Sequence, residues 1–216
     1  KVVCNSVTMN LGGQYSYTKN FQNFAGSTSD GSSFFEPSQD NEKQHLSAGY
    51  ASLNYKYNNY WNIDAGLRLE STDFNYEQNG IIVPAQSKTY TDWLPSLGVN
   101  YSNNGFGMGI SYNTNISRPS YNMLNNNYFY VSHTSWETGN PLLQSSKDHN
   151  IDFRLSYKHT YITASFTRRK RNISTTYTYL ESQNVNVRQE INLPDYDRFQ
   201  IVGSQSFDIG RWHPTL

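Results

Sequence analysis

The chain has 216 residues, and its 17 Lys and Arg are balanced by 17 Asp and Glu, so the formal net charge is zero and no basic tract points to nucleic acid. No run of about 18 apolar residues is present, which argues against a helical membrane span. Cys4 is the only cysteine, so an internal disulfide is excluded and cysteine usage does not indicate the compartment.

Apolar and polar residues alternate most regularly from Trp61 to Glu70, with apolar residues at the odd positions. Successive side chains of a strand point to opposite faces, so this segment has one apolar face and one polar, charged face. The same pattern predicts eight strands, at about residues 7–17, 46–57, 61–70, 90–101, 106–113, 150–158, 161–170 and 199–209. Arg168 interrupts the apolar face of the seventh strand, and Phe207 and Ile209 extend that of the eighth.

The predicted strands are joined alternately by short and long connections. The short ones are at 58–59, 103–105 and 159–160, and the first two consist of Asn and Gly, which tolerate positive φ. The long ones are polar and span about 18–44, 71–89, 114–148 and 171–197. This rhythm is typical of an outer-membrane barrel with short periplasmic turns and long outer loops, whereas a soluble sandwich has no reason to send every long loop to one end.

Aromatic residues, 15% of the chain, flank the short turns. They are Tyr55, Tyr57, Tyr60, Trp61, Tyr101, Phe106, Tyr157, Tyr161, Phe207 and Trp212. Rings at one level of every strand indicate an interfacial girdle, and the alternative is ordinary pairing of rings across hairpin ends.

Charged residues share the polar faces of these strands. They are Lys56, Asp64, Arg68, Glu70, Asp152, Arg154 and Lys158. An outward-facing Lys or Arg at mid-bilayer costs about 2–4 kcal/mol, so we expect these charges inside the barrel. There they would satisfy one another rather than form a catalytic pair.

No compact catalytic or metal-binding motif is present. His45, His133, His149, His159 and His213 show no close metal-ligand spacing, and neither a phosphate-binding loop nor a nucleophile elbow appears. We therefore predict no catalytic residues, no metal and no cofactor.

The long connection 114–148 is the predicted recognition segment. It carries Arg118, Tyr121, Tyr128, Phe129, Tyr130 and Trp136. Aromatic faces with Asn and Ser donors suit sugars or peptides, and loops on a rigid scaffold commonly carry function. The alternative is that these rings pack the loop against its neighbours.

One basic cluster stands where the seventh strand would leave the membrane on the long-loop side. It consists of Arg168, Arg169, Lys170 and Arg171. Because Arg binds phosphate in a bidentate manner, the cluster could contact lipopolysaccharide, and the alternative is a solvated strand end.

Several segments between about residues 45 and 172 resemble one family, and they stand in the family's order. They are Tyr50-Ala-Ser-Leu-Asn-Tyr-Lys-Tyr, Ala65-Gly-Leu-Arg-Leu-Glu-Ser-Thr, Trp93-Leu-Pro-Ser-Leu-Gly-Val, Ile116-Ser-Arg-Pro-Ser-Tyr-Asn-Met-Leu and Gly139-Asn-Pro-Leu-Leu. This set is similar to the barrel of TonB-dependent receptor-like outer-membrane proteins of the Bacteroidetes.

The resemblance implies a barrel of about 22 strands around an N-terminal plug. It also implies energised, non-catalytic uptake of a nutrient bound at the outer face, with a periplasmic energy-coupling protein that moves the plug. No plug, energy-coupling box or terminal aromatic strand is evident, so we expect residues 1–216 to be an internal segment of a longer barrel. Eight strands could instead close by themselves around a filled interior.

Three hypotheses follow. The first is an all-β, antiparallel up-and-down transmembrane barrel in a Gram-negative outer membrane. Its expected partners are lipid, lipopolysaccharide and a surface lipoprotein. The absence of a secretory signal at Lys1 is compatible with it, because the mature protein would have lost one. The second is a soluble lipocalin- or sandwich-like binding module, and the third a small outer-membrane enzyme.

Overall fold

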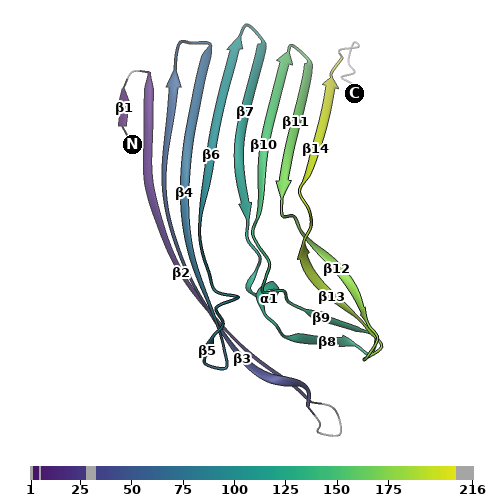
Figure 1. Ribbon diagram of the computed structural model, residues 1–216. Coiled ribbons are helices and arrows are strands. Elements are labelled where there is room, and N and C mark those ends of the chain that lie inside the picture. Colours follow the sequence, from purple (N-terminus) through teal and green to yellow (C-terminus); the bar gives the residue numbers. More distant parts are fainter. Residues whose placement is uncertain (1, 5, 28–32, 208–216) are drawn as a thin grey trace.

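The computed structural model describes residues 2–4, 6–27 and 33–207, and most of them lie in strands (Figure 1). A ten-stranded sheet contains β1 (Val2–Cys4), β2 (Val7–Ser27), β3 (Ser33–Lys56), β4 (Trp61–Gln78), β5 (Ile81–Ile82), β6 (Lys88–Asn103), β7 (Phe106–Ser117), β10 (Ser146–Tyr157), β11 (Thr160–Lys170) and β14 (Tyr196–Gln205). A four-stranded sheet contains β8 (Tyr128–Ser132), β9 (Ser135–Thr138), β12 (Ile173–Leu180) and β13 (Val185–Asn192). The short helix α1 spans Tyr121–Leu124.

The large sheet is curved and antiparallel, with its long strands in chain order: β2, β3, β4, β6, β7, β10, β11 and β14. These are the eight strands that the alternation predicts, and the all-β, up-and-down fold class is confirmed. Within the described part of the chain, β1 and β14 each pair on one side only, so the sheet has two edges. No described helix is long and apolar enough to cross a membrane.

The strand register joins the apolar faces into one continuous band. Ile110 of β7 lies opposite Val99 of β6 and Phe153 of β10. Phe153 in turn lies opposite Ala164 of β11, and Ala164 opposite Ile201 of β14. The band is solvent-exposed: Ile110 is 52% and Ile201 62% exposed. Lipid is the medium that removes such a surface from water, because a soluble β-protein buries its apolar strand faces.

The opposite face is polar, and small residues make room there for the side chains of neighbouring strands. A Cβ atom on Gly98 would overlap the carboxylate of Asp64, and one on Gly107 would overlap the hydroxyl of Ser156. The predicted pairing of inward charges is confirmed for Arg68, whose Nε donates to Glu70 Oε1 at 2.6 Å.

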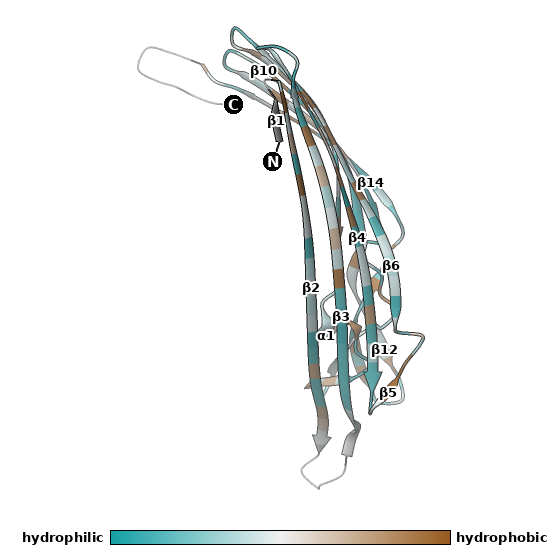
Figure 2. Cartoon of the chain, turned by 90° about the vertical axis from the view of Figure 1, so that its left-hand side faces the viewer, coloured by the Kyte–Doolittle hydropathy of each residue, from teal (hydrophilic) through white to brown (hydrophobic). Residues whose placement is uncertain are grey.

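Strands continue through much of the segments for which long loops are predicted. β2, β3 and β4 extend to Ser27, Ser33 and Gln78, so the prediction of loops throughout 18–44 and 71–78 is wrong. Beyond the bilayer the outer face of a strand meets water and the inner face can be covered by polar loops, so apolar and polar residues no longer need to alternate. The lower part of β3 is accordingly mostly hydrophilic (Figure 2).

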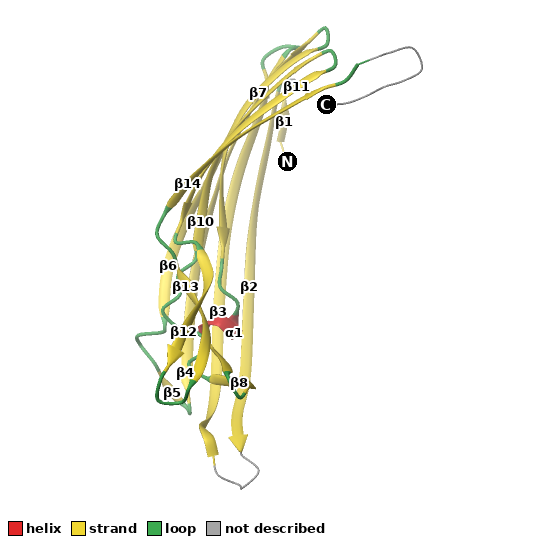
Figure 3. Cartoon of the chain, turned by 90° about the vertical axis from the view of Figure 1, so that its right-hand side faces the viewer, coloured by secondary structure: helices red, strands yellow, loops and turns green. Residues whose placement is uncertain are grey.

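The other two long connections fold together at the same end of the sheet (Figure 3). They supply β8 and β9, and β12 and β13, respectively, and β13 pairs with β9 in parallel. The core of this second sheet consists of Trp136, Val185 and Val187, with Leu180 packed against them.

At the short-turn end, aromatic rings form a row across neighbouring strands. The centroids of Trp61 and Tyr101 are 4.9 Å apart, those of Tyr101 and Phe106 6.0 Å, and those of Phe106 and Tyr157 6.4 Å. This is the arrangement expected of the predicted girdle. Ile209 and Trp212 lie outside the described residues. Asn104 and Gly105 have positive φ, as predicted for their turn.

Candidate functional site

The candidate site lies where β6 separates from β7. Their pairing runs from the short turn to Ser96 and ends beside Pro95, which has no N–H to donate. β6 continues to pair with β4 as far as Lys88. Beside this part of β6 is a cavity of about 490 Å³, lined by residues of β4 and β6, by the segments around Arg118 and Pro141, and by Gln44, Gln86 and Arg171.

Five charged side chains form a network along this cavity. Glu70 accepts hydrogen bonds from Arg68 and, at 2.5 Å, from Arg118 Nη2. Asp92 lies 2.8 Å from Lys147 Nζ and 3.9 Å from Arg118 Nη2. Glu70 and Asp92 are buried, and buried charges of this kind are tolerated when they are paired.

Three buried polar atoms on the cavity lining have no hydrogen-bond partner: Arg118 Nε, Gln86 Oε1 and Asp92 Oδ2. One is a donor and two are acceptors. Unpaired polar groups are costly when buried, so a small side-chain movement that lets a ligand or water pair with them would be favourable.

Lys88 closes one side of the cavity. Its Nζ donates to the backbone oxygens of Pro141 at 3.1 Å and Leu143 at 3.4 Å, and so bridges β6 and the chain before β10. Burial lowers the pKa of the Lys88 ammonium. Phe74 and Leu143 add buried apolar surface to the lining.

Two of the six predicted ligand-binding residues lie at the cavity. Arg118 lines it, and the Tyr121 hydroxyl donates to Gln44 Oε1 at 3.0 Å. The Tyr121 ring is stacked with Phe74, with centroids 6.3 Å apart. Both Gln44 and Phe74 line the cavity, so Tyr121 supports its wall from behind.

The other four predicted residues lie on the small sheet. Phe129 packs edge-on against Phe24 at 4.9 Å, and Tyr130 packs against His133 at 6.0 Å. Tyr128 contacts Trp136, which is only 6% exposed in the core of this sheet. Trp136 therefore packs the loop against its neighbours, which was the alternative to a ligand-binding role.

Residues 3–215 match the outer membrane protein beta-barrel family. The chain belongs to this family.

Solved transport barrels share its fold. The copper transporter OprC superposes with a TM-score of 0.66 and 14% identity over 99% of this chain and 35% of that one. The hemophore receptor HasR of Serratia marcescens superposes with a TM-score of 0.58 and 11% identity over 94% of this chain and 40% of that one. The ferric enterobactin receptor PfeA of Pseudomonas aeruginosa superposes with a TM-score of 0.56 and 12% identity over 94% of this chain and 34% of that one. No curated protein matches the chain.

This outer-membrane barrel protein thus spans between 34% and 40% of the length of these three structures. The family and the fold place it in the outer membrane of a Gram-negative bacterium. The soluble lipocalin- or sandwich-like alternative is wrong, because the apolar band is an exterior surface of a membrane barrel. The Bacteroidetes origin stays a prediction.

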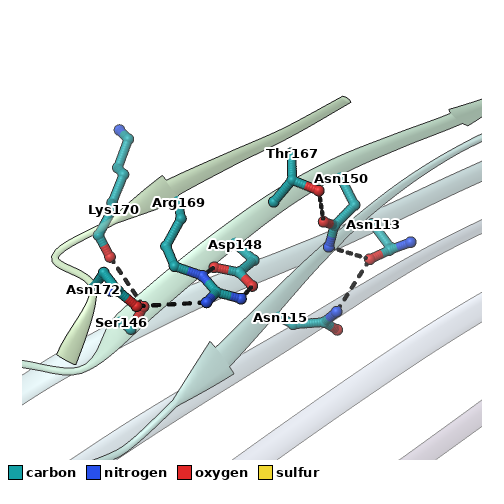
Figure 4. Close-up of polar contacts among 9 residues, drawn as sticks. All are labelled: Asn113, Asn115, Ser146, Asp148, Asn150, Thr167, Arg169, Lys170 and Asn172. Atoms are coloured by element: carbon teal, nitrogen blue, oxygen red, sulfur yellow. Dashed lines mark hydrogen bonds and ion pairs between the residues drawn. The ribbon is translucent and has the colours of Figure 1, made fainter. Parts of the chain in front are cut away.

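The basic cluster of the barrel is divided between two faces, because successive residues of β11 alternate. Arg168 lies on the same outward face as the apolar band, opposite His149 of β10. Its Nε is 3.8 Å from Asp197 Oδ1. Arg169 points to the polar face, where Nε and Nη2 donate to Asp148 at 2.7 and 2.5 Å beside the hydrogen bonds of Asn113, Asn150 and Thr167 (Figure 4).

The last residue of the cluster, Arg171, follows β11 and lines the cavity. Its Nη1 donates to Gln144 Oε1 at 2.9 Å. Of the four residues of the cluster, only Arg168 and Lys170 therefore lie on the outward face.

Sequence reasoning missed Phe74, Gln86, Lys88 and Asp92. A signal was present on β4, where the polarity of the two faces is reversed after Glu70. Outward positions become polar at Ser71 and Asp73, while Phe74 and Tyr76 point inward and are buried. Such a reversal marks the level at which a strand leaves the bilayer and meets a covering loop.

No positive sign of catalysis is found. Among the residues that the structure describes, no three His, Cys, Asp or Glu side chains gather into a metal-holding group. His149 Nδ1 is 2.8 Å from the Tyr112 hydroxyl on β7, and His133 stands between β8 and β9. The similar structures are transporters and receptors.

Proposed function

We propose that the protein binds a nutrient at its extracellular end and imports it through the barrel without catalysis, as a TonB-dependent receptor does. The cavity beside β6 supports this proposal most directly. It faces the long-loop end, and its unpaired atoms on Gln86, Asp92 and Arg118 offer both donors and acceptors. The matched structures act on copper, on ferric enterobactin and on heme with its hemophore.

The cavity suits a polar ligand with hydroxyl or amide groups, such as a sugar or a peptide. After a small side-chain movement, such a ligand can donate to Gln86 Oε1 and accept from Arg118 Nε, while Phe74 packs against its apolar side. The exposed rings of Tyr128, Phe129 and Tyr130 extend this ligand surface toward the small sheet.

Further parts would complete the transporter. The open sheet and the partial coverage of the matched structures support residues 1–216 as one segment of the barrel wall. In this proposal a plug and a periplasmic energy-coupling protein drive release into the periplasm, and a surface lipoprotein is a further partner at the long loops.

A transport assay tests the proposal. A strain that lacks the protein is complemented with the wild type, Gln86→Leu or Lys88→Met, and growth is followed on limiting iron–siderophore, heme, copper, oligosaccharide or peptide. We expect the deletion to impair growth on one of these sources, and both variants to restore it at least tenfold less well than the wild type. Gln183→Leu, in the exposed turn of the small sheet, is the control and should match the wild type. Equal growth of the deletion strain and the wild type on every source would contradict the proposal.

Lipopolysaccharide is the proposed lipid partner of the outward basic residues. Arg168 and Lys170 lie opposite His149 and Lys147 at the outer end of the apolar band, where phosphate groups of the outer leaflet are within reach. Replacing both by Gln should lower the lipopolysaccharide phosphate that copurifies with the protein. Arg188→Gln, in an ion pair of the small sheet, should leave it unchanged, and an equal loss in both variants would contradict a specific site.

A further inference from the structure

A second polar cluster lies farther toward the tips of β2, β3 and β4, away from the cavity. Glu42 of β3 stands opposite Asn20 of β2 and Tyr76 of β4, and Asp40 follows on the same face. Asp40 is 0%, Glu42 1% and Tyr76 0% exposed. The segment after α1 covers them, since Asn127 Nδ2 donates to Asp40 Oδ2.

The two carboxylates of this cluster have no cationic partner among the described residues. Lys43, the nearest lysine on β3, points to the opposite face and lies 3.5 Å from Glu77. A buried carboxylate without a counter-charge is strongly disfavoured, and two on one face repel each other. The site must therefore gain a proton or a cation.

An unpaired carboxylate oxygen points to a cation. Glu42 Oε2 accepts from Asn20 Nδ2 at 2.7 Å, but Glu42 Oε1 has no hydrogen-bond partner. The Tyr76 hydroxyl interacts with Asp40 on the same face of the sheet. A proton on Glu42 neutralises one of the two buried carboxylates, whereas a divalent cation between the strands neutralises both.

We propose that Asp40 and Glu42 hold one divalent cation of the calcium class, with the Tyr76 hydroxyl and the side-chain oxygen of Asn20 as further ligands. Calcium takes oxygen ligands in flexible geometry, and carboxylate, amide and hydroxyl oxygens are all present here. The Asn20 amide presents its oxygen after a half-turn about its last bond, since its two ends have the same shape. The ion would fasten the covering segment to β3.

Protons and the cation compete for this site. Burial raises the pKa of Glu42 to about 7; the hydrogen bond from Asn20 opposes this rise, and the charge of Asp40 adds to it. The other titratable group that faces Glu42 is Tyr76, on β4; Lys43 and Glu77 pair on the far side of the sheet. The cation needs ionised carboxylates, so its binding is tested at a pH at which carboxylates are ionised.

Calcium binding is measured on the full-length protein, purified from outer membranes in detergent and stripped with a chelator. We expect calorimetry at pH 8 to show one site that is weakened at least tenfold in Glu42→Gln and in Asp40→Asn. Glu77→Gln is the matched control, because it removes a carboxylate at the same level of the sheet on the other face. Its affinity should stay within twofold of the wild type.

Terbium luminescence excited through tyrosine provides a second readout. Tyr76→Phe should reduce the signal while both carboxylates remain, and Tyr177→Phe, on the small sheet, should not. Because Gln has the shape of Glu and removes a buried charge, Glu42→Gln should fold with the heat-modifiable migration of the wild type. Binding that persists unchanged in Glu42→Gln would belong to lipopolysaccharide phosphates and would overturn the proposal, as would a wild type that binds no calcium at pH 8.

Discussion

At the scale of single residues, the Gly139-Asn-Pro motif shows why particular residue types are needed in the covering loops. A Cβ atom on Gly139 would overlap the backbone of Asn125, including its nitrogen at 2.9 Å. Asn140 donates from its backbone to the Met123 oxygen at 2.6 Å and from its side chain to the Glu190 oxygen at 3.0 Å. These two residues thus tie α1 and β13 together.

Gly139→Ala should loosen this junction. Because the obstructing atoms are backbone and cannot rotate away, we expect a loss of about 1–3 kcal/mol in local stability. Limited proteolysis of intact cells should then cleave the covering loops faster than in the wild type. Gly49→Ala is the control, since no atom lies within 4 Å of its added Cβ. Equal cleavage of both variants would show that the close approach is unimportant.

The pH dependence of the covering segment follows from Glu42. Its pKa in the folded protein, about 7, lies above the ordinary 4.5, so the folded state binds the proton more tightly than the unfolded state does. In the presence of a chelator, the protonated Glu42 stabilises the folded state fully below pH 4.5. This contribution to the free energy of unfolding, at most about 3 kcal/mol, is lost as the pH rises through 7. Hydrogen exchange of residues 122–127 should become faster from pH 5 to 8, after correction for intrinsic rates, and Glu42→Gln should remove this trend. Protection that increases with pH would contradict the burial of Glu42.

At the scale of elements, the sequence predicts a strand well wherever lipid and lumen impose opposite demands on its two faces. All eight membrane strands were predicted for this reason. Their outer extensions were missed because water meets the outer face there, while the covering loops bury polar as well as apolar residues on the inner face, so apolar and polar residues do not alternate regularly. The parallel pairing of β9 and β13 was missed as well, since it joins residues about 50 positions apart, such as Trp136 and Val187.

The candidate site was only partly predictable for a related physical reason. Arg118 and Tyr121 stand out as an Arg and an aromatic residue in a polar loop. Lys88 and Asp92 gain their roles only because β6 leaves β7 at Pro95, which depends on register and not on local pattern. The cluster of Asp40, Glu42 and Asn20 likewise becomes visible only when three strands are aligned.

Charge insertion distinguishes the two faces of one strand. Ile110→Lys should cost about 2–4 kcal/mol of folding free energy in a lipid bilayer, because the ammonium would face hydrocarbon. Ser111→Lys, on the polar face beside Asp152, should cost much less. Denaturant unfolding in lipid vesicles measures both. Similar losses at the two positions would mean that the faces are not in different media.

At the scale of the whole molecule, one curved sheet separates two environments, and its polarity changes along its length. Near the short turns the outer face is apolar and the inner face polar. Past the level of Glu70 the outer faces of β3 and β4 become polar, and the covering loops bury Phe74 and Tyr76 on the inner face. The candidate ligand cavity and the proposed cation site both lie in this second region, outside the bilayer.

The contact of the apolar band with lipid is tested most directly by spin labels on single cysteines in a Cys4→Ser background. Labels at Leu97 and Ile151 report the outer face, and labels at Ser96 and Asp152 the inner face. In reconstituted bilayers we expect the outer labels to be accessible to oxygen and shielded from a water-soluble nickel chelate, and the inner labels to show the reverse. Equal access of the nickel chelate to all four positions would contradict it.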